Sequence, residues 1–386
     1  MNVSIKTVVE TRIMDAKTGK QVGGQTKENL VLDGGLNSLA QSSALGLACV
    51  PATMSNGCLI GSGTSPNSIG GGAVTFTQSG TTITASGSFF TSNMVGWIFK
   101  YGTGSGGTEV YITAFTNATT VTVGTSLTVS SPTAGTVWNV ARTTLDTFLF
   151  QSNTYQTNAG DCGTTISGNQ ATHKRTYKFP QQGSPYTVNE IGYASGFVSQ
   201  RVLGRVVLGS SDVVGTSNFY VVVISITVTY SPSAPLSVTN VGTNINTAGT
   251  LMCEAMSITI VTSSGATANN ISVSSILELE GTLCFKTSSY SQNGSINPTA
   301  GITVSPRVDI SGGSRAFDNT KVGSCTLTFN TGVATTGQTL FGICLRDTNV
   351  SSICLDVLFT TPQTAPTGTF QPNTVWRLTY TRTLVN

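Results

Sequence analysis

The sequence predicts an all-β protein built from β-sandwich domains. Apolar and polar residues alternate with a period of two along most of the 386 residues, which is the pattern of half-buried strands. Turn residues recur about every 8–12 positions, as they do in sandwiches and barrels. Asn56-Gly57 and Asn293-Gly294 have the composition of tight hairpin turns. These observations together favour sheets over helices throughout the chain.

One short helix is predicted, over residues Asp33 to Ala40. Asp33 is suited to cap it, and Leu36, Leu39 and Ala40 would form a short apolar stripe. A helix of about two turns is only marginally stable by itself, so this one is expected to dock on a sheet.

Breaks in composition divide the chain into three predicted parts. Gly70-Gly71-Gly72 precedes, and Ala141-Arg142 follows, a series of short strands with Gly- and Ser-rich turns. Ser231-Pro232-Ser233-Ala234-Pro235 carries two prolines, which cannot continue a central strand. The predicted parts are an N-terminal sandwich split between 1–72 and 143–232, an inserted small β module at 73–142, and a C-terminal sandwich at 236–386.

The chain carries unusually little charge. Charged residues make up 9% of it, against roughly a quarter in ordinary soluble domains. The net charge of +3 is too small to attract nucleic acid or an anionic bilayer. No apolar run approaches the ~18 residues that span a membrane, and the alternating N-terminus MNVSIKTVVETRI has no signal-peptide core. We therefore expect synthesis in the cytoplasm, no nucleic-acid partner and no membrane insertion.

The eight cysteines and the single histidine form no metal-binding pattern. No two cysteines have the C-x-x-C spacing of zinc sites, and His173 is the only imidazole available. Cys344 and Cys354 lie in strand-like segments, where a free thiol behaves as a small hydrophobic residue. The sequence predicts free core thiols, no metal and no cofactor, and leaves one or two disulfides open as an alternative.

Two motifs that resemble catalytic or cofactor sites have simpler interpretations. Gly102, Gly104 and Gly107 fit G-x-G-x-x-G, but a strand-like segment follows instead of the helix that a dinucleotide site needs, so a hairpin turn is predicted. Glu278 and Glu280 would project from one face of a strand. Their separation would suit a glycosidase pair in a polysaccharide depolymerase, whereas the simpler interpretation is a solvated outer face.

The histidine also gives no basis for catalysis. His173 is followed by Lys174 and Arg175, two cations that disfavour an imidazole acting as a base. We therefore predict no catalytic residues and no enzymatic activity.

Aromatic side chains are the candidates for binding a surface ligand. Sugar sites usually need rings on which a sugar can stack, and aromatic residues are sparse in this chain. Trp97, Tyr101 and Tyr111, all in the inserted module, are expected to be the better exposed ones. They would serve if the protein binds a host surface glycan.

Three blocks of sequence carry a family pattern. The first lies between Thr11 and Leu36 and includes DAKTGK and NLVLDGGL. The second is Gly61 to Pro66, GSGTSP, and the third and most specific lies between Lys178 and Leu203 and includes NEIGY, in which Gly192 would permit close sheet packing. Over residues 1–72 and 143–232 the chain resembles tailed-bacteriophage virion structural proteins of the minor tail, fibre, collar or decoration type.

The resemblance implies a non-enzymatic structural component of a virion, most often of the tail or of an attached fibre or collar. It also implies inserted small β modules, partners among other phage structural proteins, and a homo-oligomer, for which a trimer is the analogy. Two alternatives stay open, a host-polysaccharide receptor-binding module and a capsid decoration protein. The resemblance names no catalytic residue.

Overall fold

The structure is a computed structural model of the whole chain. From residue 231 on, side chains are described at 231, 318, 321–324 and 379–384 only. The described residues are 2–40, 57–102, 107–158, 160–167, 169–194, 201–231, 236–240, 250–253, 255–262, 283–286, 307–310, 313–318, 321–329, 333–336, 339–346, 353–364, 367–370 and 372–384.

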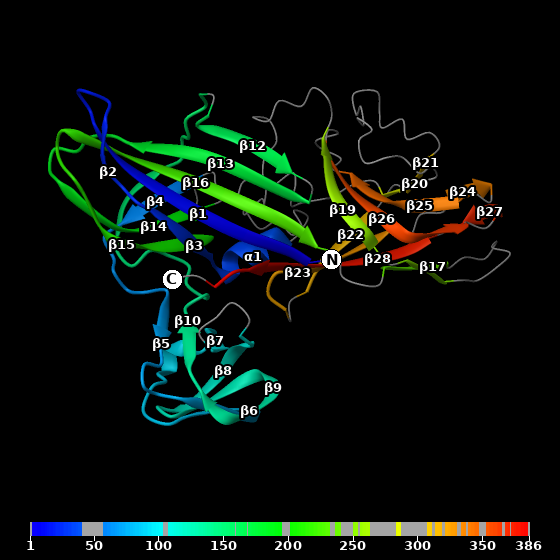
Figure 1. The fold of residues 1–386 in the computed structure, drawn as a ribbon, viewed down its shortest axis with the longest axis horizontal. Coiled ribbons are helices and arrows are strands. Elements are labelled where there is room, and N and C mark those ends of the chain that lie inside the picture. The colour runs from blue at the N-terminus through cyan, green and yellow to red at the C-terminus, as the bar shows by residue number, and fades with distance from the viewer. Residues whose placement is uncertain are drawn as a thin grey trace.

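Ten of the sixteen described strands in the first 231 residues form one curled sheet, which we call the body (Figure 1). Its strands are β1 Asn2–Asp15, β2 Gln21–Gly23, β3 Thr26–Val31, β4 Gly57–Gly61, β11 Phe148–Ser152, β12 Cys162–Ser167, β13 Gln170–Phe179, β14 Tyr186–Ala194, β15 Gly204–Val214 and β16 Asn218–Ser231. They lie in the order β11-β4-β14-β15-β3-β1-β16-β13-β12, and β2 forms a hairpin with β1.

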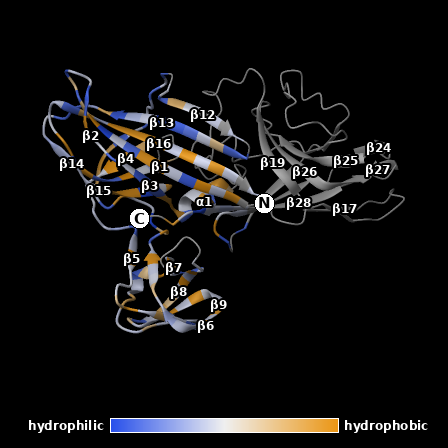
Figure 2. Ribbon diagram, in the orientation of Figure 1, coloured by the Kyte–Doolittle hydropathy of each residue, from blue (hydrophilic) through white to orange (hydrophobic). Residues whose placement is uncertain are grey.

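The first and last strands of the body pair with each other. β1 and β16 run antiparallel over their whole length. Alternate residues of β1, including Val3, Ile5 and Val9, are buried, as the period-two pattern requires. Figure 2 shows the resulting bands of hydrophobic and hydrophilic residues along β1, β16 and β13. The body is therefore fixed by a pairing between segments about 200 residues apart in sequence.

The curled sheet nearly closes on itself. β3 pairs with β1 on one side and with β15 on the other, so it connects the two layers. Just after β11, Tyr155 forms a bridge with Tyr177 of β13, and the Gln156 amide donates to the Thr176 carbonyl at 2.8 Å. The body is thus a flattened barrel with its core between two layers.

A second sheet forms the inserted module, which we define as β5 to β10. Its strands are β5 Ser68–Gly70, β6 Phe76–Ala85, β7 Ile98–Tyr101, β8 Glu109–Asn117, β9 Thr120–Thr133 and β10 Gly135–Trp138, with a short 3-10 helix η3 at Ser92–Met94. They lie in the order β5-β10-β7-β8-β9-β6. Its own aromatic core includes Phe76 and Phe99, whose ring centroids are 4.8 Å apart. β5 lies before residue 73, so the sheet takes in one strand outside the predicted module, and the predicted domain boundaries stay predictions.

The C-terminal residues form further antiparallel sheets, which we call the C-terminal lobe (Figure 1). One sheet has the order β19-β26-β25-β20-β21, β24 pairs with β27, and β18-β17-β28-β23-β22 is a third group. The strands are β17 Leu236–Asn240, β18 Thr250–Cys253, β19 Ala255–Thr262, β20 Leu283–Lys286, β21 Arg307–Ile310, β22 Gly313–Phe317, β23 Ser324–Phe329, β24 Val333–Thr336, β25 Thr339–Arg346, β26 Ile353–Thr364, β27 Thr367–Phe370 and β28 Pro372–Arg382.

The last strand belongs to both the C-terminal lobe and the body. The N-terminal part of β28 pairs with β17 and β23, and its end, from Thr379 to Arg382, runs parallel to Asn2–Ile5 of β1. A single continuous strand therefore connects the two parts.

The predicted helix is confirmed as α1, Asp33–Ala40. Leu36, Leu39 and Ala40 are buried, which confirms the apolar stripe. The prediction that Asp33 caps the helix is wrong. The helix begins at Asp33 itself, so the carbonyl of the preceding residue, Leu32, accepts from the Gly35 and Leu36 amides, and the Asp33 carboxylate binds Arg382.

The predicted all-β class is confirmed, with antiparallel sheets and a sandwich-type arrangement. Of the two predicted Asn-Gly turns, Gly57 begins β4, whereas Asn293-Gly294 lies outside the described residues. Among the described residues, no helix has the length and apolar character to cross a membrane.

Two of the predicted free thiols can be placed. Cys58 of β4 is buried and Cys162 of β12 is half-buried, and neither forms a disulfide. Cys344 and Cys354 lie on β25 and β26, where the side chains are outside the described set.

We predict that Cys58 resists alkylation in the folded protein. Burial raises the pKa of the Cys58 thiol well above its usual range, so almost no thiolate is present at mildly alkaline pH. Iodoacetamide followed by peptide mass mapping should leave Cys58 unmodified until urea is added, while the half-buried Cys162 serves as the internal comparison. Rapid native alkylation of Cys58 would contradict its placement in the core.

Candidate functional site

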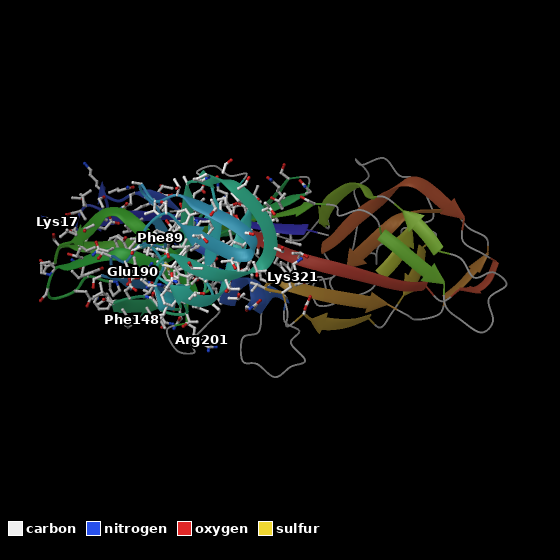
Figure 3. The ribbon with its side chains drawn as sticks, turned by 90° about the horizontal axis from the view of Figure 1, so that it is seen from below. Lys17, Phe89, Phe148, Glu190, Arg201 and Lys321 are labelled. Atoms are coloured by element: carbon white, nitrogen blue, oxygen red, sulfur yellow. The ribbon has the colours of Figure 1, made fainter. Side chains whose placement is uncertain are left out.

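A buried ionic cluster lies where the inserted module joins the body. We call it the clamp, and it consists of Arg205, Glu190, Asp146 and Asn67. The Arg205 and Glu190 side chains are both 0% exposed, and Figure 3 shows Glu190 among the side chains of the N-terminal half. Arg205 donates from Nε to Glu190 Oε2 and from Nη2 to Asp146 Oδ2, each at 2.8 Å. Neighbouring strands hold the pair, since Glu190 is on β14 and Arg205 on β15.

The third nitrogen of the Arg205 guanidinium holds the chain segment that leads into the module. Nη1 donates to Asn67 Oδ1 at 2.7 Å and to the Ser65 carbonyl at 3.0 Å. Asn67 Nδ2 donates back to the Arg205 carbonyl at 3.1 Å. Residues 65–67 are therefore fixed to β15 by reciprocal hydrogen bonds.

The Glu190 carboxylate holds the segments on both sides of the module. Its Oε1 accepts from the Gly63 amide at 3.1 Å and from the Thr147 amide at 2.9 Å. Its Oε2 accepts from the Asp146 amide at 3.1 Å. One side chain thus binds both the segment that enters the module and the segment that leaves it.

The two glycines of the GSGTSP block make this approach sterically feasible. A Cβ on Gly63 would lie 2.4 Å from Glu190 Oε1 and 2.3 Å from the Asp146 Cβ. A Cβ on Gly61 would lie 2.5 Å from the Thr147 carbonyl oxygen. Both contacts are far inside van der Waals distance, so the loop reaches the carboxylate only because these positions have no side chain.

The charges of the cluster balance. Arg142 forms an ion pair with Asp146, so two cations face two carboxylates. Burial lowers the pKa of Arg205, and the neighbouring Glu190 carboxylate opposes that shift. Burial also lowers the pKa of Arg142, and the positive charge of Arg205 adds to the effect. Guanidinium groups stay protonated in proteins despite such shifts, so both ion pairs persist.

The chemistry of the clamp favours support over reaction. All three Arg205 nitrogens and both Glu190 oxygens have protein partners. A general acid or base must instead keep an oxygen or nitrogen within reach of a substrate. Within the described part of the chain, no three side chains of the His, Cys, Asp or Glu type are placed to hold a metal ion.

A second polar junction joins the module, the helix and the last strand. Arg382 Nη2 donates to Asp33 Oδ1 at 2.5 Å and contacts the Tyr111 hydroxyl at 2.8 Å. The Tyr111 hydroxyl donates to Asp33 Oδ1 at 3.1 Å. Burial raises the pKa of Asp33, and the Arg382 charge opposes this shift. We call this set the junction.

The three aromatic residues predicted as exposed are buried or partly buried. Tyr101 is 6% exposed and its hydroxyl donates to Gln78 Oε1 at 2.9 Å, so the expectation of exposure is wrong for Tyr101. Tyr111 is partly buried and engaged at the junction. Trp97 is partly buried and packs against the module core. The period-two pattern predicted the strands that carry Tyr101 and Tyr111, but it did not predict which face of each strand turns towards the core.

The other candidate residues have structural surroundings or lie outside the described part. Gly102 follows β7 with a φ of +80°, and the next strand, β8, pairs antiparallel with β7, which confirms the predicted hairpin connection, while Gly104 lies outside the described residues. His173 is buried on β13, where its Nε2 accepts from Arg175 Nε at 3.1 Å. Glu278 and Glu280 lie outside the described residues.

Sequence reasoning identified NEIGY and GSGTSP as blocks but missed that Glu190, Arg205 and Asp146 meet. The available signal was the lone charged residue in the strand YTVNEIGYA, in a chain with 9% charged residues. The predicted role of Gly192 is confirmed, since a Cβ there would lie 2.3 Å from Val202 Cγ1.

Comparison of the chain with protein-family models, with curated proteins and with solved structures found no match.

We predict that Arg205→Met destabilises the protein by about 3–5 kcal/mol, because it leaves the Glu190 carboxylate buried without its cation. The midpoint of urea unfolding measures the loss. Arg205→Met combined with Glu190→Met should recover a large part of it, since an apolar pair of similar volume often replaces a buried ion pair at little cost.

Arg12→Met is the matched control. Arg12 pairs with Glu10 at 2.6 Å on a part-exposed surface, so its loss should cost about 0–1 kcal/mol. Equal destabilisation by Arg12→Met and Arg205→Met would contradict the role of the clamp.

Burial also predicts the behaviour of the protein in alkali. It raises the pKa of Tyr186 to about 12 and raises those of other buried tyrosines further. The other described tyrosines with raised pKa values are Tyr101, Tyr111, Tyr177, Tyr193 and Tyr220. Because unfolded tyrosine titrates near pH ~10, the folded state binds these protons more tightly. Their contribution to stability is complete below that pH and is lost as the pH rises through the folded values.

Phenolate absorbance during an alkaline titration measures this effect. The chain has ten tyrosines, and the prediction concerns these six. The six should ionise only together with the loss of β circular dichroism. Ionisation of all ten in one reversible step in the folded protein would contradict the burial described above.

Proposed function

We propose that the protein is a non-enzymatic structural component of a tailed-bacteriophage particle, located in the tail or in an attached fibre or collar. The observation that carries the proposal is the clamp. Glu190 and the Gly61–Pro66 loop belong to the blocks that resemble virion proteins, and their atoms hold a module on a body. The residues that carry the resemblance most specifically thus hold the module on the body.

The distribution of charge supports the same function. The buried ionic groups of the body and the junction bind one another, so they hold the parts of this chain together. The remaining surface is rich in Ser, Thr and Gly, because only 9% of the residues are charged. Such a surface loses little solvation energy on contact with further protein. We propose that the contacting molecules are other phage structural proteins and copies of this chain, in a homo-oligomer such as a trimer.

Host-polysaccharide binding is less well supported than this structural role. It depended on Trp97, Tyr101 and Tyr111 as a set of exposed rings, and the described packing uses the Tyr101 and Tyr111 hydroxyls inside the protein. A capsid decoration protein would have the same fold and the same clamp, and differs from the proposal only in its position on the particle.

The test is to find the protein in purified particles. We expect its peptides to co-sediment with intact phage through a density gradient, at a constant ratio to the major tail protein, and gold-labelled antibody to mark the tail or its appendages. A protein that stays in the soluble fraction of the lysate would contradict the virion role. Label spread over the head would contradict the tail position and favour the decoration alternative.

A further inference from the structure

The junction brings together three parts of the chain that are far apart in sequence. Arg382 comes from the end of β28, Asp33 begins α1 in the body, and Tyr111 lies on β8 of the inserted module. Arg382 Nη1 also donates to the Val31 carbonyl at 3.0 Å. One side chain at the end of the protein therefore binds both the body and the module.

An apolar cluster surrounds this polar contact with residues from the same three parts. Leu384 follows β28, Ile98 and Trp138 belong to the module, and Leu30 and Leu32 belong to the body. All of these side chains are at most 8% exposed. The end of the chain is thus part of the packing between module and body.

The clamp and the junction hold the module at different places. The clamp fixes the two connecting segments, 61–67 and 142–147. The junction fixes β8, a strand inside the module, to the Asp33 side chain. The backbone amide of Asp33 also donates to the Val140 carbonyl at 2.8 Å. Without the junction, the clamp still holds the two connecting segments, but β8 has lost its bond to the body.

β28 connects this contact to the C-terminal lobe. Its residues Asn373 to Thr379 pair with strands of the lobe, and the same strand continues past Thr379 along β1 to Arg382. A paired strand resists extension, so movement of the lobe away from the body withdraws Arg382 from the junction.

We propose that the end of β28 together with the two residues after it, 379–384, is a strap through which docking of the C-terminal lobe sets the position of the inserted module. When the lobe undocks, Arg382 leaves Asp33 and Tyr111, and the module is released to pivot on the clamp. The coupling is reciprocal, so loosening the module also weakens the pairing of β28 with β1. This inference does not depend on the proposed phage function.

Hydrogen exchange of the full chain tests the strap with two variants. Tyr111→Phe removes the module's bond to the junction and leaves β28 unchanged in sequence, and Arg382→Met removes the bonds of the strap. Each should raise the exchange rate of peptides covering 136–142 by at least about fivefold, the lower end of typical couplings between sites. Peptides from the module core, around Val121 and Val123, should keep the wild-type rate.

The decisive result is the effect of a change in the module on the pairing of β28 with β1. In Tyr111→Phe, exchange at 379–382 should also rise, although no residue of β28 has changed. Lys321→Met, which removes an exposed cation from the described part of the lobe, is the matched control and should change neither segment. If Arg382→Met does not fold, Arg382→Lys replaces it, because it retains the charge but not the planar fork of donors.

Two results would overturn the proposal. The first is wild-type exchange at 136–142 in both variants, which would mean that the junction does not hold the module. The second is faster exchange at 136–142 in Tyr111→Phe with unchanged exchange at 379–382, which would mean that module and lobe are not coupled.

Discussion

The ion pair between Arg205 and Glu190 is the interaction on which the arrangement of the N-terminal half depends. Removing two charges from water is costly, and the attraction between them offsets that cost only when the remaining donors and acceptors are also satisfied. Here they are satisfied by backbone from both sides of the module, at Gly63, Ser65, Asp146 and Thr147. The buried ion pair is therefore stable only when the two connecting segments are in place, and the ion pair in turn holds those segments in position.

This dependence explains how the body accommodates the inserted module. The chain leaves the body after β4 and returns before β11, and these two strands are neighbours in the sheet. An insertion at neighbouring strands leaves the barrel pairing intact, but its orientation is then set only by the connections. The clamp supplies that orientation, and the junction with Arg382 adds a second point of attachment. The clamp and the junction together therefore hold the module at two separate places.

The sequence predicted what depends on local pattern. Period two indicated the strands, and the spacing of Leu36, Leu39 and Ala40 indicated α1, because both follow from which residues share one face. It did not predict the inward direction of Tyr101, since in a sheet with two covered faces alternation does not tell one face from the other. It also could not predict that Glu190 meets Asp146 or that β28 pairs with β1, because these contacts join distant segments and leave no periodic signal. The contact between the Asp33 carboxylate and Arg382 was missed for the same reason, because it also joins distant segments.

The most direct test of this account is the hydrogen exchange of the two segments that the clamp holds, 61–66 and 143–148, in the unmodified protein. Both are outside the regular sheet pairing for most of their length, so an ordinary surface loop at these positions would exchange within seconds. The account predicts that the amides of Gly63, Asp146 and Thr147 exchange as slowly as those of β14, because they are bonded to a buried carboxylate and open only when the body unfolds. Exchange at the rate of the exposed turn at 17–20 would contradict it, because the carboxylate of Glu190 would then hold neither segment.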